Sequence, residues 1–338
     1  MEDNLYEELR AALQEKQANL SEWLEQAPEA EKRVRLGAAA KADVEQQLET
    51  IETALDHIHT GTLGICEVCH GMVDEDLLQM DYTACVCLDH YSEAERRALE
   101  SELELTQNLQ RALLPRQAPV IPGLDIAAFS RPAQIVTGDY FDFVEFKDGL
   151  PGLVIADVSG HGVSAGMLMT SLQTAFQTLA PEASSPFEVL QRLNRLYIHN
   201  INLTTFVTVF FAKFDPRTHG LSYANAGHPA YLYRADTNED LWLRRTGPAI
   251  GLVEEYPFGT TDLTLNPGDI LVLYTDGLTE AMDPDQRQYG DQAVAEVVRK
   301  YKDAPARTLV NEIIGSLTSH ISGSGLADDV TLLVTKSV

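Results

Sequence analysis

The sequence lacks long apolar runs and has little positive charge. No segment of its 338 residues reaches about 18 consecutive apolar residues, so we predict no membrane-spanning helix. Lysine and arginine total 25 against 51 aspartate and glutamate residues, which gives a net charge of −26 at pH 7. Binding to polyanions depends on lysine and arginine displacing counterions. The sequence therefore argues against general binding to nucleic acid or to anionic membranes.

Several motifs are also missing. The chain has no G-x-x-x-x-G-K-[ST] phosphate loop and no G-x-S-x-G nucleophile turn, so Ser159 is not expected to act as a nucleophile. The first residues, Met1 to Asn4, are acidic and polar rather than basic and apolar, and we expect a cytoplasmic protein. All four cysteines lie between Cys66 and Cys87, which indicates a metal site rather than disulfides in that compartment.

The N-terminal third is helical in pattern. Leucines at helical spacing over residues 4–26, and aliphatic residues over 29–59, predict an antiparallel helical hairpin interrupted at Pro28. A plain dimerisation coiled coil is the alternative. A third helix over residues 91–114 ends before Pro115 and would form a linker.

The remaining two-thirds of the chain has a strand-like rather than a helical sequence pattern. Short β-branched and aromatic runs joined by short turns predict antiparallel sheets flanked by helices, in an α+β fold. The expected strands are 124–129, 140–147, 151–157, 205–214, 220–224, 230–234, 261–265, 269–275 and 329–335, with helices at 162–180, 185–200 and 291–321, the last broken near Pro305.

The cysteine cluster has the spacing of a structural zinc site. Cys66 and Cys69 form a C-x2-C pair, and Cys87 with His90 gives a matching C-x2-H pair. Four N/S ligands satisfy the tetrahedral preference of zinc. We therefore predict one structural Zn²⁺ on these four residues, with Cys85 as the alternative ligand.

The segment from Ile51 to His90 resembles the DksA/TraR zinc-finger family. The likeness lies in A-L-x-x-I-x-x-G-T-x-G-x-C-x-x-C-x-G followed by a second pair, with His90 in place of the last cysteine. Members of that family insert a helical hairpin into RNA polymerase through acidic residues at its tip. The tip here, residues 26–31, is short and contains a proline, so a sensory or dimerising use of the scaffold is favoured over polymerase binding.

The C-terminal part contains four acidic motifs: GDYFD (138–142), DVSGHG (157–162), YTDG (274–277) and ADDV (327–330). Asp157 and Asp276 each end an apolar run, and a carboxylate at the end of a buried strand needs a cation or hydrogen bonds as compensation. Hard divalent cations prefer oxygen ligands. The motifs together predict a shared centre for two Mg²⁺ or Mn²⁺ ions that would activate a water for attack on a phosphoryl group.

These motifs, together with LQRALLP (109–115), YANAGHPA (223–230) and GPAIGL (247–252), resemble the PPM family of metal-dependent protein serine/threonine phosphatases in its SpoIIE/RsbU branch. The resemblance covers about residues 105–338. It implies an α-β-β-α sandwich and hydrolysis of a protein phosphoserine or phosphothreonine.

The resemblance also implies site roles. Asp157 would bridge two metal ions, with the Val158 carbonyl as a further ligand. Asp276 and Asp328 would complete one shell, and Asp139 would serve the other ion. Asp329 is the next candidate if the final pair is shifted by one. His161, Asn225 and His228 lie in family motifs without a ligand role that we can derive.

Two departures from the family pattern stand out. Thr137 replaces the glycine that commonly precedes Gly138, and a β-branched residue would be strained there if φ were positive. Arg131 lies upstream of Asp139, but its spacing does not identify it as a phosphate-binding arginine, so phosphate affinity would rest on the metals.

The predicted organisation is a helical hairpin over 1–60, a zinc finger over 61–90, a helical linker over 91–114 and a phosphatase domain over 115–338. We expect a phosphorylated regulatory protein as substrate, such as an anti-sigma-factor antagonist, a homodimer through the N-terminal helices, and control of the metal site through the linker. The alternatives are an RNA-polymerase-associated transcription regulator and a pseudophosphatase scaffold.

Overall fold

The computed structural model describes most of the chain from residue 40 onward. The described residues are 10, 13, 14, 17, 18, 21, 40–66, 68–73, 87, 90, 93–133, 136–160, 162–198, 205–254, 256–322, 326 and 328–338. They fall into two compact units, Met1–Ser101 and Glu102–Val338. Helix α5 (Glu93–Leu113) is continuous across that boundary. The finer division into four segments stays a prediction.

The first unit contains helix α3 (Ala40–Thr60), which is the described part of the helix predicted over 29–59. Ile51 and Ala54 on this helix are buried and pack with Leu13 and Leu63. Most of the helix predicted over 4–26, and the hairpin tip at 26–31, lie outside the described residues. None of the helices in the described part of the chain is long and apolar enough to cross a membrane.

The second unit contains two five-stranded sheets in which every described pairing is antiparallel, with the strand orders β1-β10-β9-β6-β7 and β2-β3-β4-β5-β8. The elements are β1 (Leu124–Arg131), β2 (Asp139–Glu145), β3 (Pro151–Val158), α6 (Gly162–Leu179), η2 (Ala180–Glu182), α7 (Pro186–Ile198), β4 (Val207–Asp215), β5 (Gly220–Ala226), β6 (Ala230–Arg234), β7 (Glu239–Trp242), β8 (Thr261–Thr264), β9 (Ile270–Tyr274), α8 (Asp276–Thr279), α9 (Gly290–Lys300), α10 (Ala306–Ile321) and β10 (Val330–Ser337).

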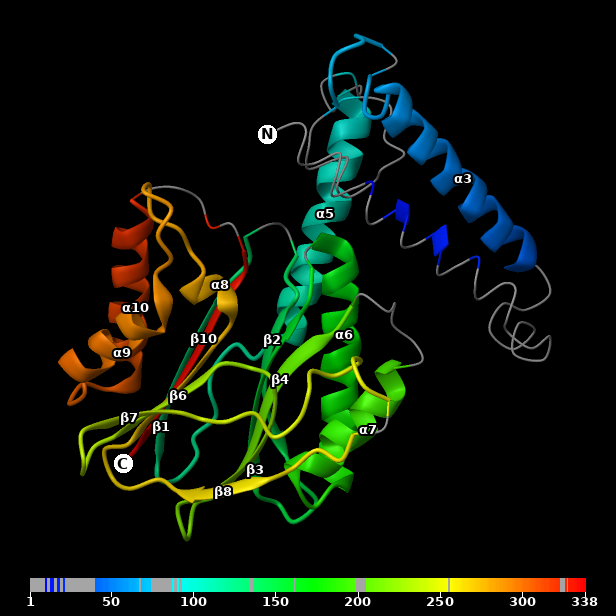
Figure 1. Ribbon diagram of the computed structural model, residues 1–338. Coiled ribbons are helices and arrows are strands. Elements are labelled where there is room, and N and C mark those ends of the chain that lie inside the picture. Colours follow the sequence, from blue (N-terminus) through cyan, green and yellow to red (C-terminus); the bar gives the residue numbers. More distant parts are fainter. Residues whose placement is uncertain are drawn as a thin grey trace. The chain divides into compact units, whose positions relative to one another are not determined.

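The two sheets pack face to face, with helices on both outer faces (Figure 1). Strand β4 shows why, because its side chains alternate between two cores. Phe210 and Phe214 point into the layer between the sheets, where they meet Leu232 and Leu273 of the other sheet. Phe211, one residue out of phase, packs in the core beneath α6 and α7.

The second sheet alternates in the same way. Leu271 and Leu273 of β9 enter the layer between the sheets, whereas Val272 and Tyr274 face the core under α9 and α10. The predicted α+β class with two helix-flanked antiparallel sheets is therefore confirmed. The pattern missed the short, largely exposed strand β7 and the four-residue helix α8, because neither has a long enough periodic run to be recognised.

Candidate metal centre

Two of the predicted carboxylates are direct cross-strand neighbours. Asp139, the first residue of β2, lies opposite Asp157 near the end of β3. Side chains so placed have Cβ atoms about 4.5–5.5 Å apart. Asp139 is two residues from Phe141, and Asp157 is two residues from Ile155, so each lies on the same face of its strand as that neighbour. Phe141 and Ile155 face the layer between the sheets. The two acidic side chains therefore lie at one end of that layer.

The other sheet brings two more carboxylates to the same end. Thr275 follows β9 directly, Asp276 begins α8, and Asp328 comes just before β10. The Thr275 hydroxyl donates a hydrogen bond to Asp139 Oδ2 at 2.9 Å and accepts one from the Thr331 backbone N–H at 2.9 Å. Thr275 thus ties the end of β9 to the start of β2 across the two sheets.

Asp329 has a different environment from its neighbour Asp328. The Asp329 side chain is buried, and its two oxygens accept backbone N–H bonds from Ala133 at 2.7 Å and Gly138 at 2.9 Å. Both donors lie in the loop that leads to Asp139. Asp328 is exposed, and its Oδ1 accepts the Asp329 N–H at 2.8 Å. The burial of Asp329 and the backbone bonds to both of its oxygens favour Asp328 as the metal ligand and Asp329 as the group that positions the loop.

Burial, and after it the neighbouring negative charges, disfavour the ionised form of the gathered carboxylates. Burial, followed by the negative charges of Asp276, Asp328 and Asp329, raises the pKa of Asp157 to about 7. Burial and the charge of Asp157 raise the pKa of Asp139 well above its ordinary value, although hydroxyl donors oppose the shift. Burial, with a smaller effect of Glu280, also raises the pKa of Asp276.

A positive charge would relieve this repulsion, and the donor set suits a hard cation. In the described part of the chain, no lysine or arginine forms an ion pair with Asp139, Asp157 or Asp276. Carboxylate and carbonyl oxygens are the ligands that Mg²⁺ and Mn²⁺ prefer. The residues therefore fit the predicted divalent cations by charge and by donor type.

Gly277 allows the two chain segments of the second sheet to approach closely. A Cβ built on this glycine would lie 2.1 Å from the carbonyl oxygen of Asp329. Any larger residue must therefore push apart the segments that carry Asp276 and Asp328. In the sequence, this glycine stands out only as part of the motif around Asp276.

A glutamine of helix α5 supports the loop before Asp139. Gln110 is buried, its amide NH₂ donates to the Thr137 carbonyl at 2.8 Å, and its carbonyl accepts from the Thr137 N–H at 2.9 Å. Its amide also reaches the Gly166 carbonyl of α6 at 3.4 Å. Thr137 does not have a positive φ, so the strain considered for a β-branched residue there does not arise.

Other polar residues of the quoted motifs lie outside the cluster. Asp142 accepts hydrogen bonds from the Tyr140 hydroxyl and the Gln177 amide, which gives it a packing role. The buried His228 has its Nδ1 2.8 Å from the Thr208 hydroxyl, and its backbone N–H and carbonyl both bond to the Asn225 side chain. Burial lowers the pKa of His228 to about 3. His161 is outside the described residues.

The supporting roles of Thr275, Gln110 and Asp329 were not predicted from the sequence. Thr275 and Gln110 were inside the quoted motifs, which was the available signal, but their partners are 136 and 27 residues away in the chain. Only the folded chain brings these pairs together.

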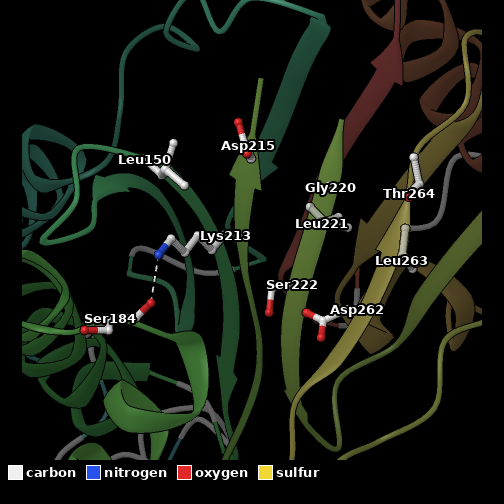
Figure 2. A pocket seen from close by; sticks show the side chains of 10 residues that line it. All are labelled: Leu150, Ser184, Lys213, Asp215, Gly220, Leu221, Ser222, Asp262, Leu263 and Thr264. Carbon is white, nitrogen blue, oxygen red and sulfur yellow. Dashed lines mark hydrogen bonds between the residues drawn. The ribbon is translucent and has the colours of Figure 1, made fainter. Parts of the chain in front are cut away.

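A separate hollow of about 430 Å³ lies at the other end of β4 (Figure 2). Lys213, which lines it, is paired opposite Gly152, whereas Thr208 is paired opposite Asp157. Lys213 and Thr208 are five residues apart on β4, which corresponds to roughly 17 Å along the strand. The Lys213 ammonium already donates to Asp148 at 2.6 Å and to the Ser184 carbonyl at 2.7 Å, so this hollow offers no unengaged lysine.

The cysteine cluster forms a second candidate metal site, in the first unit. The ligand atoms of Cys66, Cys69, Cys87 and His90 all lie within 4.8 Å of one another. Cys69 Sγ is 3.5 Å from Cys87 Sγ, and His90 Nδ1 is 3.1 Å from Cys87 Sγ. A zinc tetrahedron has edges of about 3.5–3.8 Å, so these separations suit that ion after small adjustments. Cys85 lies outside the described residues.

Backbone donors prepare two of these sulfurs for a metal. The Cys87 N–H points at Cys66 Sγ at 3.4 Å, and the Gly71 N–H points at Cys69 Sγ at 3.4 Å. Burial acts to raise the pKa of Cys66, but the backbone N–H donors outweigh it and lower that pKa to about 6. Thiolates are the form that binds zinc.

The first prediction concerns Asp157→Asn in the metal-free protein. In the unfolded chain an aspartate titrates near pH 3.9, and folding raises the pKa of Asp157 to about 7. The wild type therefore loses stability as the pH rises from about 4 to 7, because the folded state holds a proton that the unfolded state has released. Asparagine removes this penalty.

In EDTA at pH 8 we expect Asp157→Asn to raise the free energy of unfolding by about 1–3 kcal/mol, and the gain to shrink toward pH 4. Thermal denaturation at both pH values measures it. Asp262→Asn, an exposed aspartate on β8, is the matched control. A lower stability of Asp157→Asn at pH 8 would contradict the electrostatic account.

The second prediction concerns Gly277→Ala. The clash with the Asp329 carbonyl should separate Asp276 from Asp328 and weaken Mn²⁺ binding about tenfold or more, as measured by calorimetric titration. Gly315→Ala, in the interior of α10 with open space around it, is the control and should leave binding unchanged. Equal Mn²⁺ affinity in the two variants would show that this close approach does not shape the site.

Comparisons with known proteins agree with this geometry. The family model described as Stage II sporulation protein E (SpoIIE) matches residues 147–337. The chain is 32% identical over 241 residues to phosphoserine phosphatase RsbU of Bacillus subtilis, an alignment that covers 71% of each chain.

Solved structures share the fold of the second unit. The SiaA-PP2C domain of Pseudomonas aeruginosa superposes with a TM-score of 0.64 at 22% identity, covering 73% of this chain and all of that domain. RsbX, solved in complex with magnesium, superposes with a TM-score of 0.50 at 17% identity, covering 66% of this chain and 99% of its own. The family match and the relationship to RsbU together place the chain in the SpoIIE family of protein serine/threonine phosphatases.

Proposed function

We propose that the chain hydrolyses the phosphoserine or phosphothreonine of a regulatory protein, such as an anti-sigma-factor antagonist, with two Mg²⁺ or Mn²⁺ ions in its acidic centre. The observation that carries the proposal is the gathering of Asp139, Asp157, Asp276 and Asp328 at one end of the layer between the sheets. The name of the relative RsbU, a phosphoserine phosphatase, supports the substrate class.

Each residue has a role in this proposal. Asp157 would serve both cations with the Val158 carbonyl as a further ligand, Asp276 and Asp328 would hold one of them, and Asp139 would serve the other. Bound there, the cations would polarise the phosphoryl group and lower the pKa of a water nucleophile. The Thr275 hydroxyl fixes the orientation of Asp139, and Asp329 holds the loop that delivers it.

The third prediction is metal-dependent phosphatase activity. The full chain with Mn²⁺ should release phosphate from p-nitrophenyl phosphate and from a phosphoserine peptide, and EDTA should abolish both activities. Asp157→Ala should lower kcat by about 10³-fold, because it removes the ligand shared by both ions. The measurement is a phosphate-release assay.

Asp262→Ala is the control and should keep full activity, since this exposed side chain lies on β8 away from the acidic cluster. An inactive wild type that still binds Mn²⁺ would indicate the pseudophosphatase alternative. Activity that survives in Asp157→Ala would overturn the site assignment.

For the first unit we propose a structural Zn²⁺ on Cys66, Cys69, Cys87 and His90, in a finger similar to those of the DksA/TraR family. The mutual proximity of the four ligand atoms supports it. With four protein ligands the ion has no open position, so it would hold the fold and take no part in catalysis. Binding to RNA polymerase, the less favoured use of this scaffold, would depend on the hairpin tip at 26–31, which lies outside the described residues.

We also propose that the first unit controls the metal centre through helix α5. This helix runs without a break from the first unit to Gln110, whose side chain holds the residue two positions before Asp139. Leu105 and Leu109, one helical turn apart on α5, are 59% and 60% exposed, which favours burial of this stripe in a homodimer.

The fourth prediction tests the finger and its coupling together. The full chain should contain one zinc per molecule by elemental analysis, and Cys66→Ser should lose most of it and change phosphatase activity at least threefold. Ser319→Ala, at an exposed position on α10, is the control and should leave both the zinc content and the phosphatase activity unchanged.

A double-mutant cycle then tests the route. If α5 acts through its glutamine, Cys66→Ser should have little further effect on activity in a Gln110→Ala background. Asn108→Ala, an exposed position on the same helix, should leave the effect of Cys66→Ser intact. Additive effects of Cys66→Ser and Gln110→Ala would exclude this coupling, and a chain without zinc would exclude the finger.

A further inference from the structure

Beside the acidic centre lies a hollow of opposite charge. It has a volume of about 380 Å³, and its lining includes Arg111, Arg116 and Arg131. The three come from separate segments: Arg111 from the last turn of α5, Arg116 from the residues after it, and Arg131 from the end of β1. All three are exposed.

None of these three arginines forms an ion pair with any residue that the structure describes. Five other arginines of the same unit do so, namely Arg192, Arg217, Arg234, Arg287 and Arg299. The chain has 51 acidic side chains against 25 basic ones, so carboxylate partners are plentiful. Three guanidinium groups without an ion pair among the described residues therefore form a local positive field at one hollow of an otherwise acidic protein.

Two residues that line the hollow are near neighbours of the acidic centre. Arg131 is paired opposite Val330, two residues from Asp328. Thr137, which also lines the hollow, is two residues before Asp139, and its hydroxyl oxygen accepts a hydrogen bond from the Asp139 N–H at 3.0 Å. A chain segment seated in the hollow would therefore continue directly into the acidic centre.

We infer that this arginine hollow binds an acidic segment of the phosphoprotein substrate next to the residue that is dephosphorylated. The inference deepens the proposed function and rests on it. Guanidinium groups match carboxylates in geometry and keep their charge at all relevant pH values. The hollow supplies the positive charge that the acidic centre lacks, and it lies where residues flanking a phosphoserine would pass.

The experiment compares two phosphoserine peptides of equal length, one with three glutamates flanking the phosphoserine and one with three glutamines at the same positions. With Mn²⁺, the wild-type full chain should show a KM about tenfold lower for the glutamate peptide. Raising the ionic strength from 0.05 to 0.5 M should shrink this preference, because the guanidinium groups are exposed and screened by salt.

Arg111→Gln combined with Arg116→Gln should raise KM for the glutamate peptide about three- to tenfold and reduce its preference over the glutamine peptide. The double charge reversal to glutamate should reverse the preference toward a peptide flanked by lysines, which a merely structural role would not do. Arg217→Gln, on the turn after β4 and already paired with Asp215, is the matched control.

The outcomes separate the two claims. A wild type that hydrolyses both peptides with the same KM would overturn the hollow as a substrate site and leave the phosphatase proposal standing. A wild type that hydrolyses neither peptide nor p-nitrophenyl phosphate would overturn the proposed function itself. A preference that survives unchanged in the Arg111/Arg116 variant would also refute the inference.

Discussion

The burial and mutual repulsion of carboxylates at the end of a two-sheet sandwich form the constraint on which the rest of this structure depends. Two strands place Asp139 and Asp157 side by side, and the other sheet adds Asp276 and Asp328. An apolar layer below them limits access of water, so their charges are poorly screened. Such a cluster reduces the stability of the fold unless a cation binds to it.

The surrounding hydrogen bonds hold the carboxylates together against this repulsion. Thr275 bonds to Asp139 across the sheets, and Asp329 accepts bonds from two backbone amides of the loop before Asp139. Gln110 of α5 bonds to the backbone of Thr137 in the same loop. These groups are neutral or already engaged, so they fix geometry without neutralising the site. A metal centre needs both properties, a fixed set of oxygens and residual negative charge.

The sequence predicted the fold well where strands are buried on both faces. Strands β4 and β9 face a core on each side of their sheet, so they read as β-branched and aromatic runs, and these runs identified them as strands. Carboxylates at the ends of apolar runs likewise predicted that Asp157 and Asp276 belong to a site. Both signals are local, and each is set by whether a side chain is buried at its own position.

The supporting contacts could not be predicted in this way. Nothing near Thr275 in the chain indicates that its hydroxyl meets Asp139, and nothing near Asp329 indicates that its oxygens bind the amides of Ala133 and Gly138. The arginine hollow has the same origin, since its three arginines are ordinary surface residues in the sequence. Such features follow from long-range strand pairing, which a local pattern does not specify.

The most direct test of the central claim is a crystal structure of the full chain grown with Mn²⁺, with data collected at the manganese absorption edge. The account predicts two anomalous peaks about 3.5–4 Å apart among the carboxylates of Asp139, Asp157, Asp276 and Asp328. A map without peaks at this position, with those carboxylates paired to lysine or arginine side chains instead, would contradict it.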